Sequence, residues 1–123
     1  MASSLPEIRA YVDRHYAKQL TVPHLAKLAG LSRFHFIRAF RAEAGMTPHQ
    51  YLRDRRIARA RELLVTTPLP VTEICDAVGF QSLGSFCALF KRLTGEAPVS
   101  YRAARRKSAR IPDCFIRMYR VER

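Results

Sequence analysis

The sequence predicts an all-α fold of about seven helices, arranged as two helix-turn-helix lobes joined by a long linker helix. Apolar residues recur at helical spacing along most of the chain, and the alternation typical of strands is weak. Glycine and proline interrupt the helical pattern at intervals. The chain also repeats itself, because Leu25 aligns with Ile74 and Phe36 with Phe86.

The composition is that of a folded, strongly basic chain. Its 123 residues suit one compact domain or two small lobes, and 48% of them are hydrophobic, which argues against disorder. Lys and Arg total 22 against 10 Asp and Glu, a formal net charge of +12. Such a surplus is the first mark of a nucleic-acid binder. A basic surface that serves only solubility is the alternative. Membrane binding is not indicated, because the sequence contains no free helix with a large apolar face opposite Lys and Arg.

Other functional classes lack residues to support them. Three cysteines, Cys75, Cys87 and Cys114, form no CxxC pair, and the four histidines are dispersed, so we expect no disulfide framework and no metal site. A Gly-rich phosphate loop, a nucleophile elbow and an acid pair are missing, so we expect no catalytic residues, no cofactor and no enzyme. Without a signal or membrane-spanning pattern, the chain is expected in the cytoplasm.

Cap signals place the helices of the first lobe, residues 5–53. Helices are expected from residue 5 to about 16, from 21 to 29 and from 33 to 44, with the N-caps Ser4, Thr21 and Ser32. Ser4 and Glu7 have capping-box spacing. Gly30 and Gly45 are expected to end the second and third helices in the left-handed conformation.

The linker helix and the second lobe follow. The linker helix is predicted over residues 48–66, begun by Thr47, Pro48 and Gln50 and stopped by Thr67 and Pro68. The second lobe, residues 67–106, is expected to contain helices at about 71–78, 83–94 and 98–105. Residues 107–123 form a basic tail of irregular structure, whose apolar residues we expect to fold back partly on the body.

The linker helix contains many arginines, which are interpreted mainly as a solvated face: Arg53, Arg55, Arg56, Arg59 and Arg61. Its apolar residues Ala58, Leu63 and Leu64 are expected to pack between the lobes.

The internal repeat is the strongest signal in the chain. Leu25, Ala26 and Gly30 match Ile74, Cys75 and Gly79 at an offset of 49, whereas five later positions match at an offset of 50. Those positions are Phe36, Phe40, Gly45, Pro48 and Tyr51, matching Phe86, Phe90, Gly95, Pro98 and Tyr101. A short helix ending in glycine, followed by a Ser-capped helix, is typical of a helix-turn-helix. The second helix of such a unit can lie in the major groove of DNA.

Two segments resemble the DNA-binding domain of the AraC/XylS family of transcriptional regulators. They are LTVPHLAKLAGLSRFHFIRAFRAEAGMTPHQYLRDRRIARARELL and PVTEICDAVGFQSLGSFCALFKRLTGEAPVSYR, and the likeness extends over roughly residues 5–105. The resemblance implies that the helices at 33–44 and 82–94 are recognition helices entering successive major-groove segments, ~34 Å apart. The chain is then a short family member or part of a longer regulator, and Met1 directly before the first helix favours the short form.

The first recognition helix supplies most of the expected base contacts. Phe36 and Phe40, four residues apart, are expected in the core. The resemblance places base contacts at Phe34, Ile37 and Arg38, and the outward face adds Arg33. Arg38 can pair with guanine, with a phosphate clamp as the alternative. Phe34 and Ile37 can touch thymine methyl groups, or can form a partly buried flank of the lobe.

The second recognition helix has fewer groups for base contacts. Its aligned outward positions are Leu83, Gly84, Cys87 and Ala88, none with a long hydrogen-bonding side chain, and Gln81 is an added polar candidate. We therefore expect the first unit to specify sequence and the second mainly to position the duplex. Phosphate contacts are expected at Ser32, His35, Arg41, Thr47, Ser82, Ser85, Lys91 and Arg92. The later cations Arg102, Arg105, Arg106, Lys107 and Arg110 are interpreted either as further phosphate contacts or as a disordered extension.

These residues favour a sequence-specific regulator of transcription that binds double-stranded DNA as a monomer. RNA polymerase is a further candidate partner, no membrane partner is expected, and the place of action is the cytoplasmic nucleoid. A nonspecific architectural DNA binder and a protein-interaction module are the alternatives.

Overall fold

The computed structural model describes residues 2–109, and the predictions made for residues 110–123 lie outside that range. Within it the secondary structure is entirely helical, which confirms the all-α class. The helices are α1 (Leu5–His15), α2 (Val22–Ala29), α3 (Arg33–Ala44), α4 (Pro48–Thr66), α5 (Val71–Ala77), α6 (Leu83–Thr94) and α7 (Pro98–Ala109).

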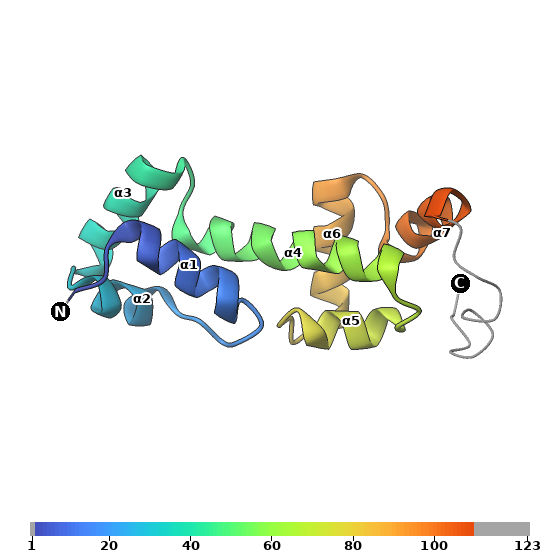
Figure 1. Ribbon diagram of the computed structural model, residues 1–123, viewed down its shortest axis with the longest axis horizontal. Helices are drawn as coiled ribbons and strands as arrows, with labels where there is room; N and C mark the ends of the chain where they lie inside the picture. Colours follow the sequence, from blue (N-terminus) through green and yellow to red (C-terminus); the bar gives the residue numbers. More distant parts are fainter. Residues whose placement is uncertain (1, 110–123) are drawn as a thin grey trace. The chain divides into compact units, whose positions relative to one another are not determined.

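The chain divides into two compact units, and the division falls inside α4. Unit 1 is Met1–Arg56 and unit 2 is Ile57–Arg123. Unit 1 therefore holds α1, α2, α3 and the first part of α4, and unit 2 holds the rest of α4 with α5, α6 and α7 (Figure 1).

The predicted capping signals of unit 1 are confirmed. Ser4 and Glu7 form a reciprocal capping box, in which the Ser4 amide donates to Glu7 Oε1 at 3.0 Å and the Glu7 amide to Ser4 Oγ at 3.3 Å. Thr21 caps α2 through a bond from the amide of His24. Gly30 ends α2 with a φ of 71°, a left-handed conformation that favours glycine.

The core of unit 1 is built on the inner face of α3. Phe36 and Phe40 have no exposed surface, and they pack with buried residues of α1, α2 and α4: Ile8, Val12, Leu25, Ala26, Ala29 and Leu52. The centroids of the two phenyl rings are 5.8 Å apart, and the Tyr51 ring meets Phe40 edge-on at 5.6 Å. This packing determines which face of α3 turns outward.

Unit 2 repeats that packing. Phe86 and Phe90 of α6 are fully buried, with centroids again 5.8 Å apart, and Tyr101 of α7 meets Phe90 edge-on at 5.2 Å. Cys75 is buried, as expected for the counterpart of Ala26. The sequence repeat is therefore a repeat of core geometry.

In each unit an arginine turns inward to hold the end of the unit's first helix. Arg56 donates to the carbonyls of Tyr16 at 2.7 Å and Lys18 at 2.8 Å, just beyond α1. In unit 2, Arg102 donates to the carbonyls of Leu64 at 3.0 Å and Thr67 at 3.1 Å, at the end of α4. These bonds satisfy carbonyls that have no partner within the helix.

The contacts of Arg56 and Arg102 contradict two interpretations made from the sequence. Arg56 is not part of a solvated face, because its guanidinium is bound to backbone carbonyls. Arg102 is only 3% exposed and cannot serve as a phosphate contact. Burial lowers the pKa of Arg102 to about 10, so its side chain stays protonated at pH 7 and remains a donor.

Two further expectations were wrong. Helix α7 ends at Ala109 instead of near residue 105, so the first residues of the expected irregular tail are helical. The physical reason is that residues 103–107 are all good helix formers and no glycine or proline follows before Pro112. Ala58 is exposed and not packed, whereas Leu63 and Leu64 are buried.

The Arg102 contacts predict a large difference between two arginines of unit 2. Replacing Arg102 by Ala leaves the buried Leu64 carbonyl without its side-chain partner, whereas Thr67 O keeps its bond from Arg106, and the change should lower the free energy of unfolding by about 1–3 kcal/mol. Arg92→Ala, at an exposed position of α6, should change it by less than about 0.5 kcal/mol. Urea unfolding followed by circular dichroism measures both, and equal values would contradict the structural role of Arg102.

Candidate nucleic-acid interface

Each unit contains a helix-turn-helix with the same backbone bonding at its turn. In unit 1, the Leu31 amide donates to Ala26 O at 3.0 Å as the chain leaves α2. In unit 2, the equivalent bond runs from the Phe80 amide to Cys75 O, also at 3.0 Å. Ser32 and Ser82 then cap α3 and α6. The same turn bond and the same serine cap therefore precede α3 in unit 1 and α6 in unit 2.

The outward side of α3 brings together the base-contact residues predicted for unit 1. Phe34, Ile37, Arg38 and Arg41 stand at i, i+3, i+4 and i+7, so they form one line, called here the α3 stripe, opposite the buried phenylalanines. Ile37 is half-buried and the other three are exposed. Arg33 lies beside the stripe, with its Cζ 5.2 Å from the centroid of the Phe34 ring.

The α3 stripe is strongly cationic because acidic groups are absent from it. The one acidic residue of α3, Glu43, is paired with Arg9 of α1 at 3.6 Å. Arg38 and Arg41 therefore present their charges outward. A helix surface of this kind suits a polyanion, and Arg has the planar donor geometry for bidentate contacts.

The matching surface of α6 is small and mostly uncharged. The α6 stripe consists of Gly84, Cys87, Ala88 and Lys91, the residues 50 positions after those of the α3 stripe. Leu83 beside it is 41% exposed. Burial raises the pKa of the half-buried Cys87 thiol, so it is neutral at pH 7. Charge enters this surface only in the last turns, at Lys91 and Arg92.

The predicted phosphate contacts lie at helix ends and on exposed turns. Ser32 Oγ accepts the His35 amide and Ser82 Oγ accepts the Ser85 amide, both at 3.2 Å. Thr47 Oγ1 accepts the Gln50 amide at 3.2 Å at the start of α4. The other phosphate candidates are exposed, namely His35, Arg41, Ser85, Lys91 and Arg92, and so is the base-contact candidate Gln81.

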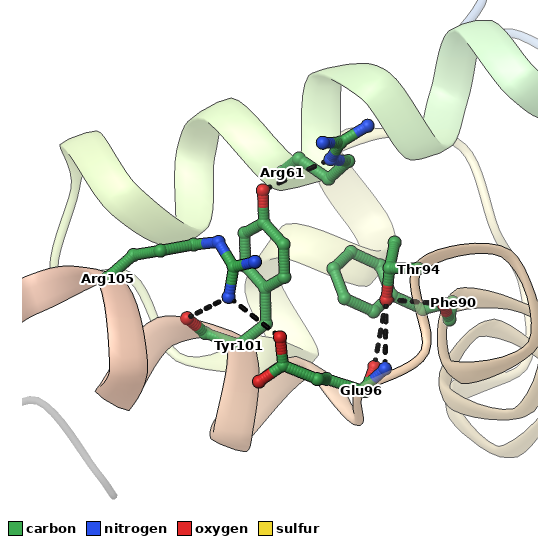
Figure 2. Close-up of polar contacts among 6 residues, drawn as sticks. All are labelled: Arg61, Phe90, Thr94, Glu96, Tyr101 and Arg105. Carbon is green, nitrogen blue, oxygen red and sulfur yellow. Dashed lines mark hydrogen bonds and ion pairs between the residues drawn. The ribbon is translucent and has the colours of Figure 1, made fainter.

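A polar cluster that the sequence did not predict supports the end of α6 in unit 2 (Figure 2). Arg105 Nη1 is 2.9 Å from Glu96 Oε1, and its Cζ lies 3.6 Å from the Tyr101 ring centroid. Arg61 Nε donates to the Tyr101 hydroxyl at 3.1 Å. Thr94 Oγ1 donates to Phe90 O at 2.8 Å and closes the helix. The side chain of Arg105 is therefore bound to the turn between α6 and α7. No local sequence pattern predicts its pairing with Glu96.

Other kinds of site find no support in the described part of the chain. Among residues 2–109, no group of three or more His, Cys, Asp or Glu is placed to hold a metal ion. None of the helices in that range is both long and apolar enough to cross a membrane.

These features define a tandem helix-turn-helix domain of the DNA-binding class, and comparison with known proteins agrees. The profile of the helix-turn-helix domain family matches residues 25–104. The HTH-type transcriptional activator AarP of Providencia stuartii is 34% identical over 101 residues, covering 82% of this chain and 75% of that protein.

Solved structures show the same relationship. The DNA-binding domain of AdpA, a global transcriptional factor solved in complex with a target DNA, matches with a TM-score of 0.83 and 36% identity, covering 87% of this chain and 96% of that one. A probable AraC family transcriptional regulator from Rhodopseudomonas palustris matches with a TM-score of 0.73 and 25% identity, over 82% and 95% of the two chains.

The chain belongs to the AraC-type helix-turn-helix family of transcriptional regulators, which confirms the resemblance inferred from the sequence. Several curated relatives are much longer, and the chain spans 37%, 45% and 24% of the length of three of them.

Proposed function

We propose that the chain is a sequence-specific regulator of transcription that binds double-stranded DNA by inserting α3 and α6 into successive segments of the major groove. The observation that supports this most is the α3 stripe, whose arginines form no ion pair with an acidic residue of the described range 2–109, while the opposite face of the helix is buried in the core. An α-helix fits the major groove, and base edges there distinguish all four base pairs.

The base contacts we propose are unequal between the units. In unit 1 they are Arg33, Phe34, Ile37 and Arg38, and Arg38 pairs with a guanine through O6 and N7. In unit 2 they are Gln81, Leu83, Gly84 and Cys87, which supply few donors and acceptors. The first unit therefore specifies sequence, and the second mainly fixes position on the duplex.

The phosphate contacts we propose are distributed over both units: Ser32, His35, Arg41 and Thr47 in unit 1, and Ser82, Ser85, Lys91 and Arg92 in unit 2. Ser32 and Ser82 are occupied as acceptors by backbone amides, and their hydroxyl protons can still donate to a phosphate oxygen. Because both units belong to one chain, a monomer can bind an asymmetric DNA site. The place of action we propose is the nucleoid. RNA polymerase is the further partner we propose.

Selection of bound sites from random duplex DNA tests the proposed function. We expect an enriched motif, and binding to it should persist in a mobility-shift assay with excess random competitor. An architectural binder would lose the complex to the competitor, and a protein-interaction module would bind neither DNA. A pool without any enriched motif would contradict sequence-specific binding.

The inequality between the units predicts different effects of two cation substitutions. Arg38→Ala should weaken binding to the selected site by about 10-fold or more and relax the preference at one base pair, since a good bidentate contact discriminates by ~1–3 kcal/mol. Lys91→Ala should weaken binding similarly on all sequences and reduce the salt dependence by about one phosphate contact. Titrations on the site and on single-base variants measure both effects, and the reverse pattern would contradict the assignment.

A further inference from the structure

Two arginines of α7 place their guanidinium groups side by side at the end of α4. Arg102 Nη2 and Arg106 Nη2 both donate to Thr67 O, at 3.1 and 3.0 Å, so two positive charges share one neutral carbonyl. The two residues are four positions apart on one face of the helix, where like charges repel each other. All of these groups belong to unit 2.

Each of the two arginines also has a buried donor that lacks an acceptor. Within residues 2–109, no group accepts a hydrogen bond from Arg102 Nη1 or from Arg106 Nε, although both atoms are shielded from solvent. Buried donors in folded proteins nearly always have a partner, because an unsatisfied one loses its hydration without compensation. The two orphaned donors therefore indicate an acceptor that the described residues do not supply.

The charges of the pair are not balanced by a carboxylate in the described part of the chain. Its ion pairs include neither Arg102 nor Arg106, and in unit 2 Glu62 and Glu96 are paired with other arginines, at 3.0 and 2.9 Å. Burial and the positive charge of Arg106 lower the pKa of Arg102 to about 10, so Arg102 is still charged at pH 7. Buried charges in proteins are normally paired, so the missing acceptor is expected to be an anion.

Unit 1 has no such pair of cations. The residues 50 positions before Arg102 and Arg106 are Leu52 and Arg56. Leu52 is buried in the core, so of these two positions only Arg56 brings a guanidinium to the backbone carbonyls. One arginine at these positions is thus enough for the fold that the units share, and the second cation of unit 2 is available for another role.

We propose that unit 2 binds a carboxylate group between Arg102 and Arg106, with one oxygen accepting from Arg102 Nη1 and the other from Arg106 Nε. A carboxylate matches two donors with two oxygens, whereas a phosphate brings further oxygens into a buried site, each of which needs a donor. A duplex cannot reach Arg102, which is 3% exposed, but rotation of the half-buried Arg106 side chain admits a small ligand. The bound carboxylate stabilises the contact of α7 with the end of α4.

Two sources supply the same chemistry. The carboxylate belongs either to a small organic acid in solution or to this chain beyond residue 109, where Asp113, Glu122 and the C-terminal carboxylate lie in sequence. The experiment separates the two sources.

NMR spectroscopy of the arginine Nε–H groups tests the proposal in the full chain. The probe is sodium acetate at pH 7, and sodium chloride at equal ionic strength is its control. We expect acetate, but not chloride, to shift the Arg106 Nε–H resonance in a saturable way. We also expect acetate to raise the thermal unfolding midpoint by about 5 °C at ten times its Kd, since a ligand that binds only the folded state stabilises it.

Two substitutions serve as matched variants. Arg106→Gln identifies the resonance by its loss and should abolish the acetate-dependent rise in the midpoint. It is expected to fold, because Thr67 O keeps its bond from Arg102. Arg14→Gln removes one positive charge at an exposed position of α1 and should keep both acetate effects.

A third protein identifies the source of the carboxylate. It combines Asp113→Asn and Glu122→Gln with a C-terminal amide, so that residues 110–123 offer no carboxylate. An acetate response in the wild type supports a ligand from solution. A response that appears only in the third protein supports a carboxylate of the chain itself, which occupies the site in the wild type.

Three results would overturn the proposal. The first is the absence of an acetate-specific shift of Arg106 Nε–H in both the wild type and the third protein. The second is an equal rise in the midpoint of wild type and Arg106→Gln, which indicates a general effect of the solvent. The third is a shift by inorganic phosphate at lower concentration than by acetate, which rejects the carboxylate as the preferred anion. None of these results involves DNA, so they leave the proposed function standing.

Discussion

The orientation of each recognition helix depends on two phenylalanines placed four residues apart. Phe36 and Phe40 anchor α3, and Phe86 and Phe90 anchor α6, with the same separation between ring centroids. Because both rings of a pair are buried, the helix cannot rotate without losing much of the core of its unit. The residues on the opposite side are consequently held outward, whatever their chemistry.

The two units therefore share their core packing and differ in the side chains of their outward surfaces. Caps, turn bonds and the phenylalanine–tyrosine packing occur in both units. The outward positions differ, since Phe34 and Arg38 have Gly84 and Ala88 as their counterparts. The tyrosine contacts differ as well: the Tyr51 hydroxyl donates to Asp13, whereas the Tyr101 hydroxyl accepts from Arg61. Two units of one fold can in this way divide base recognition and positioning between them.

The sequence predicted the features that depend on local or periodic signals. The caps Ser4, Thr21 and Ser32 and the turn at Gly30 follow from side-chain chemistry within a few residues. It did not predict which arginines turn inward, because Arg56 and Arg102 lie in basic helices whose pattern is typical of a solvated face. Their partners are carbonyls 35 to 40 residues away, and no local pattern encodes such a contact. The stripe positions were predicted, but the exposure of Phe34 required the structure.

Interference mapping of one complex tests the central claim, that the two units contact DNA unequally. The selected duplex is treated either to remove single bases or to ethylate single phosphates, and bound and free fractions are compared. The account predicts phosphate interference in two segments on one face of the DNA, about one helical turn apart. It predicts strong base-removal interference in only one of them, and Arg38→Ala should diminish the signal there. Equal base-removal interference in both segments, or interference in one segment alone by both treatments, would contradict it.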